Sequence, residues 1–187
     1  MKTGVFIHVS ADGFFAGPDG EIDWFNEIEQ DKEWEKYSHD QAQAGKKILV
    51  LGRKTYDMMK SFWPTPKAIE MDPQMARVVN ESQKIVFSKT LKNVEEGPNW
   101  KNIRLYHEIN PDEIKKLKEN NNMTILASGS IIQQFANLGL IDEYSLMVFP
   151  MILGKGKLLF ENVKRMNLRL LESRQFGNGV VLLRYQH

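Results

Sequence analysis

The sequence has 187 residues, of which 42% are apolar and 26% charged, and its formal net charge is +1. This composition excludes a disordered chain and predicts one globular domain over residues 1–187. The balanced charge gives no support for binding to nucleic acid or to a membrane surface. Disulfides and thiolate chemistry are excluded because there is no cysteine. No signal-peptide pattern and no bilayer-length apolar run is present, so we expect a cytoplasmic protein.

The chain opens with an apolar, β-branched segment, Gly4–Ser10, which predicts a first strand. His8 lies inside it. A single histidine in a strand is most often part of the packed core. No second histidine or carboxylate stands at metal-ligand spacing, so we predict no metal site.

Residues 11–24 follow this strand and contain three glycines and a Pro-Asp-Gly turn signal. One interpretation is a plain connecting loop. The other is a lid over a ligand, which the aromatic residues Phe14, Phe15 and Trp24 favour because a solvent-exposed connector has no need of them. Residues 26–44 are polar and favour a helix.

The remaining chain alternates predicted strands with predicted helices. Strands are expected at Lys47–Leu51, Lys84–Phe87, Ile103–Tyr106, Met123–Ala127 and Tyr144–Phe149. Helices are expected at Ala68–Glu81, after the Asn110-Pro111 start signal, and between the possible N-cap at Ser128-Gly129-Ser130 and the C-cap Gly139. Two final strands, Leu168–Gln175 and Val180–Tyr185, flank the hairpin signal Asn178-Gly179. This order predicts an α/β fold with a mostly parallel sheet, flanking helices and an antiparallel C-terminal hairpin.

Three of the predicted strands end in residues suited to phosphate. These are Gly52-Arg53-Lys54-Thr55, Ser88-Lys89-Thr90 and Ser128-Gly129-Ser130. Each alone is more simply a tight turn or an exposed helix start. Ligands of open α/β sheets bind beyond the carboxyl ends of the strands, so the three segments together predict a phosphate-bearing cofactor.

Five segments give the chain a resemblance to the dihydrofolate reductase-like superfamily, closest to the branch of the bacterial riboflavin-biosynthesis reductase (the RibD C-terminal domain). They are SADGFFA, LGRKTY, FSK, ASGSIIQQF and LIDEYSLMVFPMILGKGKLLF. The resemblance spans essentially the whole chain and implies NADPH as the hydride donor. No GxGxxG fingerprint is present, which disfavours a standard Rossmann fold.

The resemblance also implies roles for individual residues. Ala11 and the Gly13–Gly17 loop would cover the nicotinamide. Gly52, Arg53 and Thr55 would contact the pyrophosphate and the adenosine side. Ser88 and Lys89 would bind the 2′-phosphate, and the pyrophosphate would lie on the helix start formed by Gly129, Ser130, Ile131 and Ile132.

The proton donor is not settled by the residues. The resembled folate reductases keep a carboxylate shortly after a tryptophan, but spacing from Trp24 favours Glu29 whereas spacing back from Trp34 favours Asp31. A water molecule is the third alternative. The chain also has Ala127-Ser128-Gly129 where folate reductases usually have adjacent glycines.

Three functions are therefore open. The first is an NADPH-dependent reductase of a pterin-, folate- or pyrimidine-like heterocycle. The second is the riboflavin-pathway 5-amino-6-(5-phosphoribosylamino)uracil reductase, with Lys155 and Lys157 suited to the substrate phosphate. The third is a non-catalytic nucleotide-binding dimer. The apolar closing strands and the resemblance predict a homodimer in each case.

Overall fold

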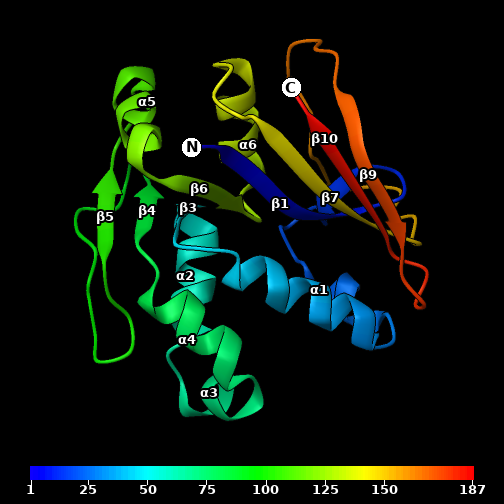
Figure 1. Ribbon diagram of the computed structural model, residues 1–187, viewed down its shortest axis with the longest axis horizontal. Coiled ribbons are helices and arrows are strands. Elements are labelled where there is room, and N and C mark those ends of the chain that lie inside the picture. The colour runs from blue at the N-terminus through cyan, green and yellow to red at the C-terminus, as the bar shows by residue number, and fades with distance from the viewer.

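An eight-stranded sheet forms the centre of the computed structural model, which describes residues 1–187 (Figure 1). Across the sheet, the strands lie in the order β5 (Ile103–Tyr106), β4 (Lys84–Phe87), β3 (Lys47–Gly52), β6 (Asn122–Leu126), β1 (Thr3–Ser10), β7 (Glu143–Phe149), β10 (Val181–Gln186) and β9 (Arg169–Gln175). Neighbours from β5 to β7 are parallel, whereas β10 is antiparallel to both β7 and β9. The predicted mostly parallel sheet with an antiparallel hairpin is confirmed.

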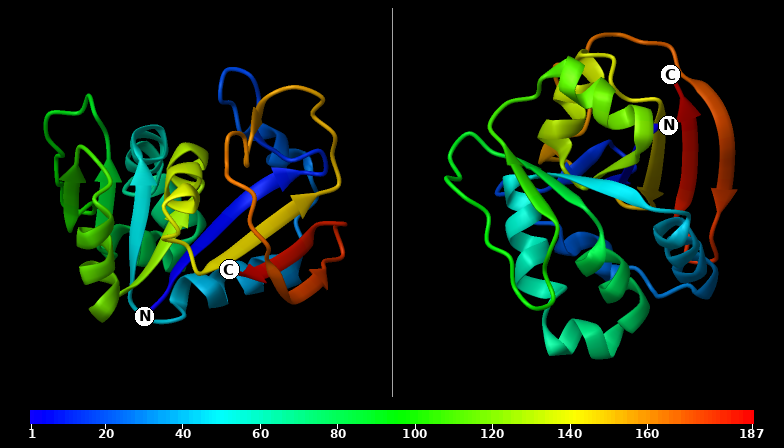
Figure 2. Two further views of the ribbon diagram at one scale, coloured as in Figure 1. Left: turned by 90° about the horizontal axis from the view of Figure 1, so that it is seen from above. Right: turned by 60° about the vertical axis from the view of Figure 1, so that its left-hand side comes forward.

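Helices cover both faces of this sheet (Figure 2). The helices are α1 (Lys32–Gln43), α2 (Arg53–Phe62), α3 (Pro66–Met71), α4 (Pro73–Glu81), α5 (Pro111–Asn120), α6 (Gly129–Asn137) and the short 3-10 helix η1 (Asp23–Glu27). None of them is both long and apolar enough to cross a membrane.

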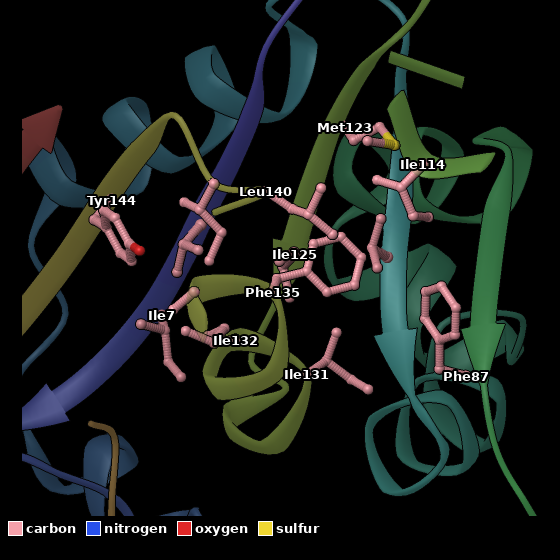
Figure 3. Packing of buried hydrophobic residues seen from close by; sticks show 14 of the residues in the cluster. Ile7, Phe87, Ile114, Met123, Ile125, Ile131, Ile132, Phe135, Leu140 and Tyr144 are labelled. Atoms are coloured by element: carbon pink, nitrogen blue, oxygen red, sulfur yellow. The ribbon is translucent and has the colours of Figure 1, made fainter. Parts of the chain in front are cut away.

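The face under α5 and α6 holds the largest apolar cluster. Alternate residues of β1 point to it because side chains in a strand alternate between faces: Val5, Ile7 and Val9 lie there, each at most 5% exposed. Ile132 and Phe135 of α6 are fully buried against them (Figure 3). The helical spacing of the apolar residues in α6 thus sets how this helix lies on the sheet.

The opposite face is covered by α1, α2 and α4. Tyr37 of α1 packs with Phe149 and Leu182 over β7 and β10, in a cluster that also contains Trp24. Tyr56 of α2 belongs to a separate cluster over β3 and β4. The sheet therefore carries apolar residues on both faces, as expected for parallel strands with helices on each side.

The single helix predicted at Ala68–Glu81 is wrong. The chain forms α3 and α4 with a break at Asp72, whose φ is −145°. Two local causes act together: the residue before a proline is disfavoured in helical geometry, and the Asp72 side chain accepts a hydrogen bond from the Met75 amide as an N-cap.

Residues 11–24 are more ordered than a connecting loop. They contain β2 (Phe14–Ala16), which pairs antiparallel with β8 (Lys157–Leu158) in a separate two-stranded sheet. The helix expected over residues 26–44 starts only at Lys32, after η1, with Asp31 as its N-cap. The cap predicted at Asn110 is confirmed. The C-cap of α6 is Leu138, and Gly139, expected as the cap, follows it with a φ of +65°.

Candidate active site

The carboxyl ends of β1 and β6 form a topological switch point. The two strands are neighbours, and their pairing ends at Phe6 opposite Leu126. From β1 the chain leads to α1 on one face, and from β6 it turns into α6 on the other. Ligands of open α/β sheets bind where connections leave in opposite directions, so this point is the candidate active site.

A buried hydroxyl holds the switch point together. Ser128 Oγ accepts a hydrogen bond from the Gly52 amide at 2.9 Å and contacts Thr55 Oγ1 at 2.9 Å, so it joins the starts of α2 and α6. Thr55 in turn donates to the Ala127 carbonyl at 3.3 Å. Ala127 has a φ of +46°, a conformation that non-glycine residues rarely adopt. Such backbone geometry is concentrated at functional sites.

Ser128 is therefore a link between helices rather than a side-chain N-cap, which corrects the sequence-based expectation. It occupies the N-cap position of α6 but makes no side-chain capping bond. Its carbonyl accepts hydrogen bonds from the Ile131 and Ile132 amides, and both isoleucine side chains are buried in the core. The amides of Gly129 and Ser130 precede them at the helix start, where no intrahelical acceptor exists. Gly129 and Ser130 are thus better placed than Ile131 and Ile132 to meet an anion.

The Gly13–Gly17 segment packs directly on this helix start. Phe15 lies on Gly129 so closely that a methyl group added there would be 2.3 Å from its ring carbons. Gly13, with a φ of +87°, accepts a hydrogen bond at its carbonyl from Leu159, and Ala11 donates its amide to the Met151 carbonyl at 2.8 Å. The segment that we expected to cover the nicotinamide therefore lies between α6 and residues 151–159.

Asp12 is a site residue that the sequence analysis missed. Its carboxylate accepts hydrogen bonds from the Ser10 hydroxyl at 2.6 Å, from the Gly154 amide at 2.8 Å and from the Leu153 amide at 3.2 Å. These bonds, that of Ser10 foremost, hold the pKa of Asp12 below its usual value. In the sequence, only the Asp12-Gly13 pair after the first strand points to this residue, and such a pair indicates an ordinary turn equally well.

The second strand-end group lies at β3 and β4. Arg53 Nη1 donates to Thr90 Oγ1 at 3.0 Å, and its Nε pairs with Asp57 at 3.2 Å, so it links α2 to the turn after β4. Ser88 is buried, and its hydroxyl accepts hydrogen bonds from the amides of Thr90 and Leu91. Lys89 is exposed beside it. Ser88 thus shapes the turn, and Lys89 and Arg53 supply its positive charge.

The two candidate acids lie at the start of α1. Asp31 Oδ1 accepts a hydrogen bond from the Trp34 amide at 2.8 Å, and Oδ2 lies 2.6 Å from where a Cβ on Gly177 would stand. The Glu29 side chain is exposed, and its carbonyl accepts a hydrogen bond from Asn178 at 3.1 Å. Both residues therefore lie against the β9–β10 turn, and Asp31 has a capping role that accounts for it without catalysis.

His8 lies on the α1 side of the switch point. Its ring is surrounded by Phe25 at 4.9 Å, Phe149 at 5.1 Å and Trp34 at 5.9 Å between centroids. Burial among these rings lowers its pKa from 6.5 to about 4. No group of three or more His, Cys, Asp or Glu residues is placed to hold a metal ion.

Comparison with known proteins then identifies the family, because the model of the RibD C-terminal domain matches residues 3–182. The chain belongs to the RibD C-terminal domain family. It is 32% identical over 182 residues to the uncharacterized protein YyaP of Bacillus subtilis (strain 168), covering 96% of this chain and 91% of YyaP.

Solved structures agree with this family assignment. A protein from Shewanella sp. PV-4 that is named for riboflavin biosynthesis is 26% identical, with a TM-score of 0.75 over 100% of this chain and 98% of its own. Dihydrofolate reductase from Enterococcus faecalis, solved with NADP(H), has a TM-score of 0.65 at 12% identity and covers 99% of this chain and 95% of its own. This member of the RibD C-terminal domain family thus has the dihydrofolate reductase-like fold.

Proposed function

We propose that this protein is an NADPH-dependent reductase of a pterin-, folate- or pyrimidine-like heterocycle. The observation that carries the proposal is the pair of contacts that the Ser128 hydroxyl makes with Gly52 and Thr55, here called the Ser128 junction. It brings the starts of α2 and α6 together at the carboxyl ends of β3 and β6, beside a backbone at Ala127 with positive φ. Membership of the RibD C-terminal domain family supports a reductase. The cytoplasmic location and the homodimer remain predictions.

The residues at the junction fit a dinucleotide. The start of α6 has no side-chain cap, so the Gly129 and Ser130 amides and the helix dipole would receive a pyrophosphate, with Phe15 packed on Gly129 beside it. Lys89 would supply positive charge for the 2′-phosphate, with Ser88 holding the turn that presents it, and Arg53 would contact the pyrophosphate and the adenosine side. When bound, NADPH supplies the hydride. Ala11, Gly13 and Gly17 lie on the segment that would exclude water from the nicotinamide.

The proton for the reduced ring nitrogen comes from Asp31, Glu29 or water. Three substitutions separate these sources in steady-state assays. Asp31→Asn and Glu29→Gln each remove one acid, and Asp31→Ser removes the acid but keeps a good N-cap for α1. A true donor loses about a hundredfold in rate with NADPH affinity intact. If Asp31→Ser retains the parent rate, Asp31 is a cap only.

A riboflavin-pathway substrate is the second candidate, and two lysines favour it. A methyl group on Gly20 would lie 2.9 Å from Lys157 Nζ and 3.6 Å from Lys54 Nζ, so the two ammonium groups converge. No ion pair in the structure involves either one. Converging unpaired cations suit a phosphate on the substrate.

The decisive experiment measures NADPH oxidation with the purified protein over a panel of heterocycles. The panel includes dihydrofolate, a dihydropterin and the phosphoribosylaminopyrimidine of riboflavin synthesis. Turnover of the last compound, lost in Lys157→Ala, selects the second candidate. NADPH binding without oxidation over the whole panel selects the non-catalytic nucleotide-binding dimer.

A further inference from the structure

His8 lies in the stretch of β1 that has no strand on its β6 side, next to the switch point. Its pairing with β6 ends at Phe6, two residues earlier, because β6 turns away at Ala127. On its other side His8 pairs with Met147 of β7. The imidazole therefore lies where the sheet opens, on the face that α1 covers.

The walls around His8 are aromatic. The rings of Phe25 and Trp34 meet it edge-on, with interplanar angles of 82° and 62°, and Phe149 is tilted at 48°. Phe6 packs at 5.8 Å from the same strand. Phe149 also contacts Phe25 and Trp34, so these packed rings fix the orientation of the imidazole.

Among these aromatic rings the imidazole of His8 has no hydrogen-bond partner. No hydrogen bond contributes to its pKa, which burial alone lowers to about 4, so the ring is neutral at pH 7. A neutral imidazole carries one donor and one acceptor. His8 is only partly buried, and neither of its ring nitrogens is fully enclosed. By contrast, Nε1 of Trp24 and Nε1 of Trp34 are fully enclosed and have no hydrogen-bond partner. The ring nitrogens of His8 therefore reach accessible surface.

A structural role does not account for these features. A phenylalanine would fill the same aromatic surroundings, so packing alone does not require an imidazole whose nitrogens reach the surface. An accessible imidazole at a switch point is a hydrogen-bonding group available to a polar ligand.

We propose that His8 is a specificity-determining residue that hydrogen-bonds the edge of an uncharged heterocycle lying beside the cluster of Phe25, Trp34 and Phe149. This inference rests on the proposed reductase function, because it assigns the substrate side of the same site. The group bound at His8 is a ring N–H, amino or carbonyl group, because a neutral imidazole can donate one hydrogen bond and accept another.

The first test observes the imidazole directly by NMR of protein labelled with ¹³C at histidine. The chain has four histidines, and His8→Phe assigns the His8 signal by its loss. Dihydrofolate, 6-methylpterin and 5-aminouracil are added in turn to protein saturated with NADP⁺, whether or not each is reduced. We expect at least one to shift the His8 signal while His187, exposed at the C-terminus, is unchanged. A His8 signal that none of them moves overturns the proposal.

The second test separates recognition from packing. His8→Phe keeps the aromatic surroundings, His8→Gln restores a donor and an acceptor, and His187→Phe is the matched control. We expect His8→Phe to weaken the Kd of the heterocycle that shifts the signal by about tenfold, with NADPH affinity within twofold of the parent, and His8→Gln to recover part of the loss. Equal heterocycle affinity in His8→Phe, or an equal loss of NADPH affinity, rejects the proposal. Failure of the parent to bind or oxidise NADPH is a separate result and rejects only the reductase function.

Discussion

The ring of Phe15 lies on the Cα of Gly129, so that a Cβ at Gly129 would be 2.3 Å from two of the ring carbons. One residue belongs to the segment after β1 and the other to the start of α6. This contact joins the segment that we expect over the nicotinamide to the helix start that we expect under the pyrophosphate. It requires glycine, because no side-chain carbon fits in the space.

Gly129→Ala should destabilise the protein by about 1–3 kcal/mol, the usual effect of overpacking, and weaken NADPH binding. Thermal unfolding and NADPH titration measure the two effects. Gly97→Ala is the control, because nothing lies within 4 Å of its added methyl group. The double variant Phe15→Ala with Gly129→Ala should recover the stability lost to the clash. If it is as unstable as the sum of both single variants, the Phe15 contact is not the cause.

Ser128→Ala should lower the free energy of unfolding by about 1–3 kcal/mol, because the buried Gly52 amide loses its acceptor. NADPH affinity should fall as well, since α2 and α6 lose the link between their starts. Urea unfolding checks the first effect. Ser130→Ala removes a neighbouring exposed hydroxyl and should leave stability within about 0.5 kcal/mol of the parent. Equal stability of the two variants contradicts the role of Ser128.

Lys84 should make stability depend on pH in the alkaline range. Burial lowers its pKa from 10.5 to about 8, although its ammonium group donates to the carbonyls of Asn80 and Ser82. Between pH 8 and 10.5 the unfolded chain therefore binds the proton more fully than the folded one, so this group's contribution to stability rises with pH. Urea unfolding from pH 8 to 9.5 should show a positive slope relative to Lys84→Met. Parallel pH profiles of the parent and Lys84→Met reject this assignment.

The exposed leucines of β9 are the surface that we expect to mediate the homodimer. Leu170 and Leu171 are 51% and 38% exposed on an edge strand, where unpaired backbone groups and apolar side chains both favour association. Light scattering at micromolar concentration should give twice the mass of the chain, and Leu170→Glu with Leu171→Glu should halve it. Leu138→Glu, exposed on the helical layer, should stay dimeric. A monomeric parent sinks this prediction.

Local patterns predicted most of the fold. The bounds of β4 and β5 agree with their short apolar runs, and Asn110 caps α5 as its neighbour Pro111 indicated. The pairing of β2 with β8 was beyond such patterns, because three residues gain a strand only from a partner about 140 positions away. The break at Asp72-Pro73 was visible in the sequence and was missed.

The candidate site was less predictable than the fold. Strand-end composition indicated the Ser128 region, but the hydroxyl's link to Gly52 depends on tertiary contact between two helix starts. His8 was assigned to the core because one strand residue carries no sign of whether its neighbours will satisfy it. That no strand lies beside His8 on the β6 side became evident only from the structure, in which the pairing of β1 with β6 ends at Phe6.

The central claim is that NADPH binds across the carboxyl ends of β3, β4 and β6. Titration of the parent and of Lys89→Ala with NADPH and NADH tests it most directly, with Lys92→Ala as the control. Because a charged hydrogen bond contributes about 1.5–3 kcal/mol, the parent should bind NADPH about tenfold to a hundredfold more tightly than NADH. Lys89→Ala should lose most of that preference, and Lys92→Ala should keep it. Equal binding of NADPH and NADH by the parent, or no binding of either, would contradict the account.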